Sequence, residues 1–168
     1  MDLVVFGQAG PDYRLPMGFR PVDVVMASGR PMLVVPFAGE FATVGRRVLV
    51  AWDGTREAAR ALHDALPLLM KAEVVVVMTV PAQKASFDGR SLGRVMRHLK
   101  WYDIRATPEE TPRGDIPTSD VLLSRAADFD ADLIVSGAYH HSQLREAIIG
   151  GVSRDLLDHT TVPVLISH

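Results

Sequence analysis

The chain has 168 residues, a formal net charge of −2 and no cysteine. At about 150 residues per domain, this length predicts roughly one domain with a hydrophobic core of its own. The lack of cysteine excludes disulfides, thiolate nucleophiles and cysteine-ligated zinc. The charge argues against a basic nucleic-acid surface, and no apolar run approaches the ~18 residues of a membrane span. No signal peptide is apparent, so we expect a cytoplasmic protein with no nucleic-acid or membrane partner.

The apolar residues are concentrated in six short blocks, the longer of which are rich in valine or isoleucine. Their apolar character is continuous and does not alternate with polar residues. This pattern indicates burial on both faces, as in the strands of a parallel sheet. We therefore predict strands over Leu3–Phe6, Met32–Val35, Val48–Ala51, Val74–Met78, Leu133–Val135 and Val164–Ile166.

Helical patterns separate most of these strands. The segment Thr55–Lys71 carries alanine and leucine at helical spacing, so that one helix face is apolar. Thr55 can cap this helix, and Pro67 should kink or end it near its last turn. Further helices are predicted over Leu92–Tyr102, Ser119–Ala127 and Leu144–His159, with a weak strand over Ile104–Thr107.

From Arg47 onward, strands and helices alternate along the chain. This alternation predicts a parallel sheet joined by right-handed crossovers, which is a doubly wound α/β domain. In such folds ligands bind outside the carboxyl ends of the strands. The segments expected at those ends are Asp53–Thr55, Val80–Ala82, Thr107–Glu110 and Gly137–His141.

Two segments near the N-terminus resemble two segments near the C-terminus. Asp2–Gly7 resembles Asp132–Gly137 at an offset of 130 positions, and Pro31–Val35 resembles Pro163–Ser167 at an offset of 132. Both copies run in the order strand, glycine, loop, helix and a strand that follows proline. This order indicates an internal repeat. The alternative is that any two βαβ units look alike.

The repeat predicts a division of the chain into two parts. Residues 1–46 would be the closing βαβ part of a first domain whose opening, roughly a hundred residues, is missing. Residues 39–45 would form the linker, and residues 47–168 a complete second domain.

Three separated segments of the second part share their order and spacing with one family of proteins. They are Arg47–Thr55 with Glu57–Ala59, Ala131–Gly137 with Gly150–Ser153, and Asp155–Ile166. On these residues the second part resembles a universal stress protein domain, and residues 1–36 resemble the end of another. The resemblance implies a five-stranded parallel sheet of the adenine nucleotide alpha hydrolase-like, Rossmann-like kind, here with an extra N-terminal βαβ unit. It also implies dimer-like pairing through the last strand.

One branch of this family binds ATP, and the resemblance implies where a nucleotide would lie. Asp53 stands where an aspartate of that branch contacts the nucleoside. Glycines of the phosphate loop let backbone N–H groups approach the phosphates. Gly137 and Gly150 match two positions of this loop, but His140 replaces a glycine and Gly151 replaces a serine or threonine. The nucleotide-binding residues that the resemblance implies are Asp53, Thr55, Val80, Gly137, His140, Gly150, Gly151, Val152 and Ser153, with ATP or AMP and Mg²⁺ as cofactors.

The two departures from the loop pattern weaken the expectation of tight ATP binding. The side chain at His140 disfavours a positive φ and occupies space near the phosphates. A protonated His140 or His141 could instead pair with a phosphate. Asp53 has an alternative role as a helix cap, and the ring of Trp52 could reshape a nucleoside pocket.

Other polar residues give weaker indications of a metal site or a catalytic site. Glu109 and Glu110 with Asp115 could hold Mg²⁺, but a solvated loop is the better interpretation. The sequence contains no Gly-x-Ser-x-Gly nucleophile elbow. We therefore assign no catalytic residue and no metal ligand.

Three hypotheses for the function follow. The first is a cytoplasmic stress-response module that binds ATP or AMP and forms a homodimer through its last strand. The second is a degenerate relative that binds no nucleotide and acts through contacts with unknown protein partners. The third is a slow ATPase or another hydrolase on the same fold. The strands Met32–Val35 and Val164–Ile166 are expected to pair with each other, within one chain or between two.

Overall fold

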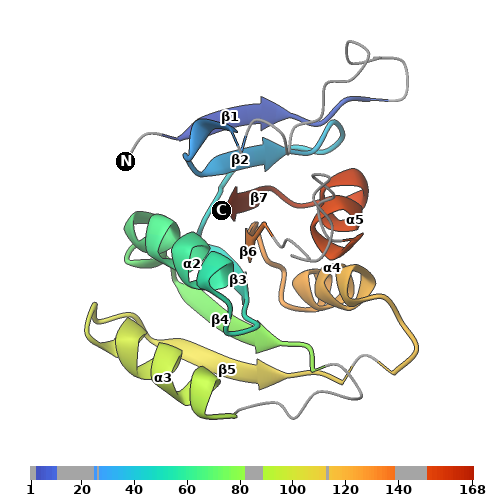
Figure 1. Ribbon diagram of the computed structural model, residues 1–168. Helices are drawn as coiled ribbons and strands as arrows, with labels where there is room; N and C mark the ends of the chain where they lie inside the picture. The colour runs from blue at the N-terminus through green and yellow to red at the C-terminus, as the bar shows by residue number, and fades with distance from the viewer. Residues whose placement is uncertain (1–2, 11–24, 26, 82–88, 113, 139–150) are drawn as a thin grey trace.

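The computed structural model describes residues 3–10, 25, 27–81, 89–112, 114–138 and 151–168 (Figure 1). The strands are β1 (Val4–Gly7), β2 (Met32–Val35), β3 (Arg47–Ala51), β4 (Val74–Thr79), β5 (Ala106–Glu110), β6 (Leu133–Gly137) and β7 (Val164–Ser167). The helices are α2 (Arg56–Leu69), α3 (Gly89–Lys100), α4 (Thr118–Asp128) and α5 (Gly151–His159). Within these ranges, no helix combines the length and the apolar character needed to cross a membrane.

The described strands form one sheet in the order β1-β2-β7-β6-β3-β4-β5. All neighbours among the five strands from β3 to β7 are parallel, which confirms the doubly wound five-stranded parallel sheet. The N-terminal unit adds β1 and β2, which are parallel to each other, to the same sheet. β2 runs antiparallel to β7, so the predicted pairing of the last strands occurs within the chain. A homodimer through β7 stays a prediction, and it would require β2 to leave that edge.

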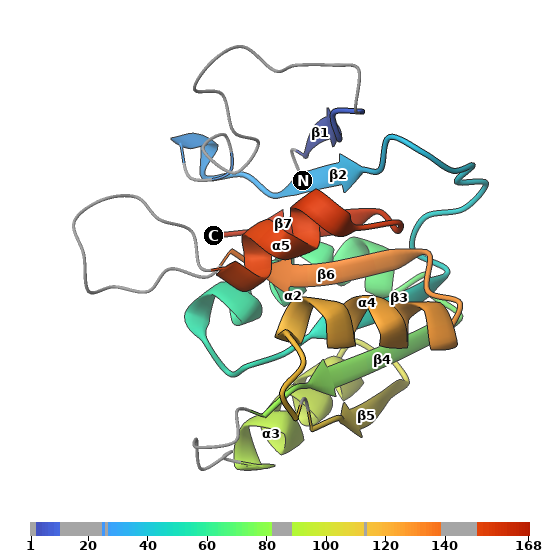
Figure 2. The same ribbon diagram turned by 90° about the vertical axis from the view of Figure 1, so that its right-hand side faces the viewer.

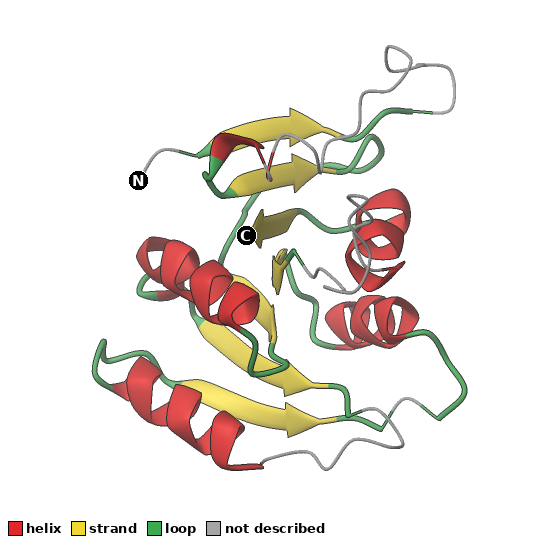
Figure 3. Cartoon of the chain, in the orientation of Figure 1, coloured by secondary structure: helices red, strands yellow, loops and turns green. Residues whose placement is uncertain are grey.

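Helices cover both faces of the sheet. α2 and α3 lie on one face, and α4 and α5 lie on the other (Figures 2 and 3). One apolar cluster, which includes Ile134 and Leu156, lies beneath α4 and α5, and a second, which includes Val135 and Leu66, lies beneath α2 and α3. Successive residues of a strand point to opposite faces, so strands buried on both faces need an unbroken apolar run.

Helix α2 begins where the sequence predicts, after Thr55, and ends at Leu69, two residues before the predicted Lys71. Thr55 is its N-cap, and the Thr55 Oγ1 atom accepts a hydrogen bond of 3.2 Å from the backbone N–H of Ala58. Pro67 lies inside the last turn, where it lacks the N–H group of one helical hydrogen bond, and the helix ends two residues later at Leu69. The apolar face of α2 packs on β6 and β7.

The weak strand lies later in the chain than Ile104–Thr107, where it is predicted. The structure has β5 over Ala106–Glu110. Ile104 is 7% exposed, and its backbone N–H donates to the carbonyl oxygen of Leu99 at 3.1 Å. Together with Asp103, whose φ is +58°, it closes the end of α3 in a Schellman arrangement. The prediction was wrong because a buried residue that closes a helix resembles a strand residue in sequence.

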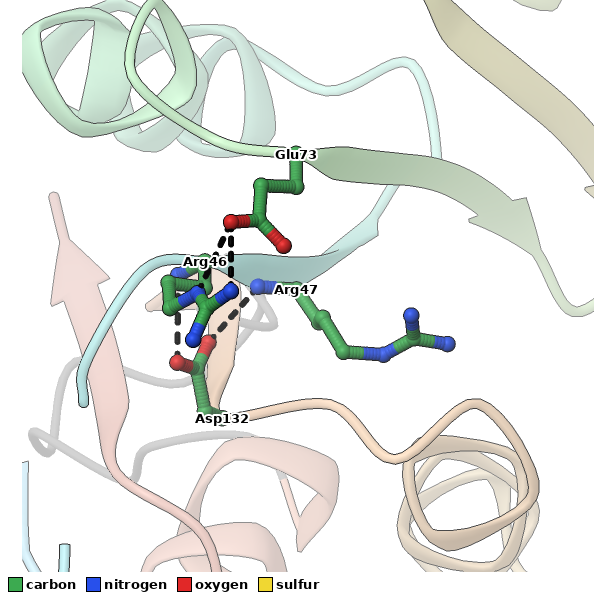
Figure 4. Close-up of polar contacts among 4 residues, drawn as sticks. All are labelled: Arg46, Arg47, Glu73 and Asp132. Carbon is green, nitrogen blue, oxygen red and sulfur yellow. Dashed lines mark hydrogen bonds and ion pairs between the residues drawn. The ribbon is translucent and has the colours of Figure 1, made fainter. Parts of the chain in front are cut away.

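The start of β3 is held by a carboxylate from the start of β6 (Figure 4). Asp132 accepts hydrogen bonds from the backbone N–H groups of Gly45 at 3.0 Å, Arg46 at 3.1 Å and Arg47 at 2.8 Å. The side chain of Arg46 pairs with the carboxylate of Glu73, which precedes β4. Burial alone would raise the pKa of Asp132, but the hydrogen bonds to its carboxylate bring that pKa below its ordinary value.

The N-terminal strand pair has the same register as the C-terminal pair. Adding 130 to each residue number of β1 and 132 to each of β2 reproduces the pairing of β6 with β7. The hydrogen bonds correspond as well. The backbone N–H of Val4 donates to the Pro31 carbonyl oxygen at 3.0 Å, and that of Ile134 donates to the Pro163 carbonyl oxygen at 2.9 Å. The segments matched in the sequence therefore occupy equivalent positions in the sheet.

The antiparallel contact between β2 and β7 joins these two strand pairs symmetrically. Leu33 pairs with Leu165, which is its own counterpart in the other copy, and Met32 pairs with Ile166. A local two-fold axis normal to the sheet therefore passes between Leu33 and Leu165. The side chain of Gln8 adds a further link, since its Nε2 atom donates to two carbonyl oxygens near the end of α5 at 2.9 and 3.0 Å.

Candidate functional site

The carboxyl ends of β3, β4 and β6 lie side by side, because β3 pairs with both of the other strands. Asp53 follows β3, Val80 follows β4, and Gly137 ends β6. The structure therefore brings three of the expected binding segments to one edge of the sheet. The fourth, Thr107–Glu110, lies within β5 and does not follow a strand. It was misplaced because the strand begins two residues later than predicted.

The carboxylate of Asp53 is exposed at this edge. Its Oδ1 atom accepts hydrogen bonds from the backbone N–H of Thr55 at 2.9 Å and from the Thr55 hydroxyl at 2.6 Å. Asp53 therefore orients the residue that caps α2 and does not cap the helix itself. Its Oδ2 atom makes no hydrogen bond to any residue in the described ranges.

The side chain of Trp52 is held by α3. Its Nε1 atom donates to the hydroxyl of Ser91 at 3.1 Å, and its ring borders the apolar cluster beneath α2 and α3. Gly54 has a φ of +79°, and a Cβ atom there would lie 2.7 Å from the same Ser91 hydroxyl. These contacts fix the loop between β3 and α2, which carries Asp53.

Gly137 is a glycine because helix α2 approaches it closely. A Cβ atom at Gly137 would lie 2.6 Å from the backbone nitrogen of Ala58 and 2.6 Å from the carbonyl carbon of Glu57. Real side chains do not tolerate such distances to backbone atoms. The match of Gly137 to a phosphate-loop glycine is therefore also explained by the packing of a helix on a strand.

The first turn of α5 contains three of the expected residues. Gly151 and Val152 are exposed, whereas Ser153 is 1% exposed. The hydroxyl of Ser153 donates to the carbonyl oxygen of Gly137 at 3.2 Å. This serine joins α5 to the end of β6, so its hydroxyl is not presented to a phosphate. His140 and Gly150 lie outside the described residues, as does the start of the helix predicted from Leu144.

A buried hydroxyl lies next to Val80, another expected binding residue. The Oγ1 atom of Thr79, at the end of β4, is buried and has no hydrogen-bond partner among the described residues. Val80 itself is half-buried and packs against the cluster beneath α4 and α5. Val80 therefore contributes apolar surface at this edge of the sheet.

Glu57, in the first turn of α2, is a charged residue at this edge that is not among the binding residues expected from the sequence. It is 9% exposed and lies against Gly137. Burial alone would raise its pKa, but the hydrogen bond from Arg56 and the charges of Arg56 and His168 bring the pKa below its ordinary value. Helical spacing could have revealed it, because Glu57 lies four residues before Ala61 on the apolar face.

The acidic residues Glu109, Glu110 and Asp115 were interpreted as a solvated loop in preference to a Mg²⁺ site, and this is wrong for the two glutamates, which lie in β5. Glu109 lies in β5, and its carboxylate forms an ion pair with Arg125 of α4. Its Oε1 atom also accepts a hydrogen bond of 3.3 Å from Thr111. Asp115 is exposed on the loop before α4. The ion pair with Arg125 therefore gives Glu109 a structural role between β5 and α4.

Comparison with known proteins agrees with this architecture. A sequence model of the universal stress protein family matches residues 45–168. A universal stress protein of Synechocystis sp. is 22% identical over 167 residues, a match that covers 98% of this chain and 57% of that protein. The chain therefore spans less than two thirds of the length of this relative.

Two solved structures show the same fold. A universal stress protein of Archaeoglobus fulgidus is 19% identical with a TM-score of 0.69, and the match covers 98% of this chain and 61% of that one. A universal stress family protein of Burkholderia pseudomallei is 24% identical with a TM-score of 0.56, and the match covers 77% of this chain and 98% of that one. With the family match over most of its length, the chain belongs to the universal stress protein family.

Proposed function

We propose that the chain is a cytoplasmic stress-response module that acts by binding and recognises the nucleoside part of an adenine nucleotide, ATP or AMP, at Asp53. The observation that carries this proposal is the exposed Asp53 carboxylate at the adjacent carboxyl ends of β3 and β6. Ligands of doubly wound folds bind at this edge of the sheet. The Asp53 Oδ2 atom is available to accept hydrogen bonds from ribose hydroxyl groups.

The described residues fit a triphosphate less well than a nucleoside. The hydroxyl of Ser153 is buried on the carbonyl oxygen of Gly137, so it is not directed at a ligand. The backbone and Cβ atom of Glu57 lie against Gly137, and its carboxylate, which pairs with Arg56, adds no positive charge for a phosphate there. We therefore propose that the phosphates add little to affinity, and that adenosine and AMP bind about as tightly as MgATP.

Calorimetric titration of the full chain tests this proposal. Adenosine, AMP and MgATP are expected to give similar affinities, and Asp53→Ala is expected to abolish the binding heat for all three. Asp115→Ala is the control, because Asp115 is also an exposed aspartate in a loop. The proposal fails if no nucleotide is released on denaturing the purified protein and none of the three ligands produces heat.

A module without nucleotide that acts through protein contacts is the alternative. The buried Ser153 hydroxyl and the two sequence departures at His140 and Gly151 favour it. A hydrolase is less well supported, because the described residues do not assemble a nucleophile, a base and an oxyanion site. The same titration separates the first two hypotheses, since the alternative predicts no binding heat.

For the domain organisation, we propose that residues 47–168 form one complete domain and residues 1–46 the closing part of another. The matching register of β1–β2 and β6–β7 supports this division. The Burkholderia relative supports it too, because 98% of that chain is covered by 77% of this one.

A further inference from the structure

The outer edge of β1 is the place where the two copies differ. β1 is the last strand of the sheet on its side, whereas its counterpart β6 lies between β7 and β3. Val4 and Gln8 donate their backbone N–H groups toward β2. Backbone groups alternate in direction along a strand, so Val5 and Gly7 direct theirs to the outer edge. Val5 is 64% exposed, and its counterpart Val135, which β3 and α2 cover, is 0% exposed.

Gly7 adds a second, independent difference. Its counterpart Gly137 must be a glycine because the backbone of α2 lies 2.6 Å from the position of a Cβ atom. At Gly7, a Cβ atom would have no described atom outside its chain neighbours within 4 Å. Its φ is also outside the region that favours glycine. Nothing within the described chain therefore explains why this position lacks a side chain, but the approach of a helix would explain it.

From these observations we infer that the outer edge of β1, with Gly7 and Val5, is a docking site for a strand–helix unit of the same kind as β3–α2. The strand of this unit lies parallel to β1 in the register in which β3 pairs with β6. Its helix covers Val5 and approaches Gly7 as α2 approaches Gly137. Main-chain hydrogen bonds give affinity in such strand addition, and side-chain contacts give specificity. The inference goes beyond the nucleotide proposal and does not depend on it.

The geometry favours this partner over a second copy of the chain joined through β1. Two β1 strands related by a two-fold axis would pair their edges, but neither copy has a described helix to lay over Val5. Such a dimer would also leave Gly7 without a close neighbour. A β3–α2 unit supplies both the helix that covers Val5 and the close neighbour of Gly7. The equivalent interface, between β3–α2 and β6, is already formed in this chain.

A peptide with the sequence of residues 43–72, which includes β3 and α2, is the probe. The peptide carries a fluorophore, and its binding to the full chain is followed by fluorescence anisotropy. We expect saturable binding, with the backbone amides of Val5 and Gly7 becoming protected from hydrogen exchange. Gly7→Leu is expected to weaken binding at least about tenfold, because the leucine side chain fills the space of the incoming helix.

Two further variants make the result decisive. Val5→Lys is also expected to weaken peptide binding, and it should leave the melting temperature unchanged because Val5 is exposed. Gly93→Leu is the control, since Gly93 of α3 also has no described atom near a Cβ position and lies far from β1 in the sheet order. The site is supported if Gly7→Leu and Val5→Lys lose peptide binding and Gly93→Leu keeps it.

Other results would overturn the inference. These are no binding of the peptide, equal binding by Gly7→Leu, or a dimer of the unliganded chain that Gly7→Leu dissociates. The second result would mean that the peptide replaces β3 in its own place beside β6. The third would make a second copy the occupant of the edge. Neither measurement uses a nucleotide, so failure here is distinct from failure of the nucleotide proposal.

Discussion

The Oδ1 atom of Asp132 accepts a 2.8 Å hydrogen bond from the backbone N–H of Arg47 (Figure 4), and this contact joins the starts of β6 and β3 across 85 residues of sequence. The backbone N–H groups of Gly45 and Arg46 converge on the same carboxylate. One side chain therefore sets where the chain leaves the N-terminal unit and enters β3.

Replacing this carboxylate should destabilise the protein in a pH-dependent way. Asp132→Asn is expected to lower the free energy of unfolding by about 2 kcal/mol at pH 7, because an amide can accept fewer of the backbone hydrogen bonds. The pKa of Asp132 is lowered in the folded state from 3.8. Its contribution is therefore present above that value and lost as the pH falls through the folded-state pKa. Urea unfolding at pH 7 and pH 3 measures both effects.

The exposed Asp115 provides the control for that experiment. Asp115→Asn should change stability by less than about 0.5 kcal/mol at either pH, because no described contact depends on it. An Asp132→Asn protein with the stability of the native chain at pH 7 would show that the three backbone contacts contribute nothing.

The two counterpart glycines should respond very differently to the same substitution. Gly137→Ala is expected to cost about 3 kcal/mol, because its Cβ atom would overlap the backbone of α2. Gly7→Ala should stay within about 0.5 kcal/mol of the native chain. Thermal unfolding of both variants measures the difference, and equal effects would contradict the steric explanation.

Replacing either of two exposed aspartates that have a left-handed backbone conformation with glycine should stabilise the protein. Asp103 has a φ of +58° and Asp130 a φ of +48°, and each ends a helix. Glycine adopts this conformation without the steric cost of a Cβ atom. Asp103→Gly and Asp130→Gly are each expected to raise the free energy of unfolding by about 0.5 kcal/mol. In urea unfolding, the double variant should show the sum of the two increases in midpoint. A loss of stability in either variant would show that its side chain makes a compensating contact.

The cap of α2 can be tested apart from ligand binding. Thr55→Ala removes the hydroxyl that accepts from Ala58, and we expect a loss of about 1 kcal/mol in chemical unfolding. Thr55→Ser keeps that hydroxyl and should recover most of the loss. If serine fails to recover it, the threonine methyl group and not the cap accounts for the effect.

The two departures from the family's phosphate-loop pattern, at His140 and Gly151, predict a gain of nucleotide affinity when they are reversed. His140→Gly combined with Gly151→Ser should increase the affinity for MgATP relative to AMP in calorimetry. A serine side chain fits at Gly151, because the nearest described atom to its Cβ position is Asp155 Oδ2 at 3.8 Å. An unchanged ratio of the two affinities would show that the loop departures are not what limits phosphate binding.

Much of the fold could be predicted because the short apolar runs are typical of strands that are buried on both faces. Strands as apolar as Val74–Thr79 need cover on both faces, and the helical patterns between the strands supply that cover. β5 was harder, since it is a polar edge strand and Ile104 beside it belongs to a helix end. Its position depended on a left-handed residue, which the sequence does not mark unless it is glycine.

The sequence predicted at which edge of the sheet the candidate site residues lie, but not which atoms they contact. Topology alone puts Asp53 and Gly137 at one edge of the sheet. The partners of their atoms depend on contacts between distant segments: α2 against Gly137, and Ser153 on the Gly137 carbonyl oxygen. The same contacts show why a residue type that fits a phosphate-loop pattern can have a packing role as well.

The sequence by itself determined the family resemblance and the parallel α/β architecture, and it predicted an internal repeat, because hydrophobic patterning and short motifs are local. Only the tertiary structure decided that β2 and β7 pair within one chain, around an axis between Leu33 and Leu165. Only the structure separated the roles of Gly7 and Gly137, which look alike in sequence. The physical reason is that a glycine's role depends on what approaches it, and the helix that approaches Gly137 comes from a segment about 80 residues earlier in the chain.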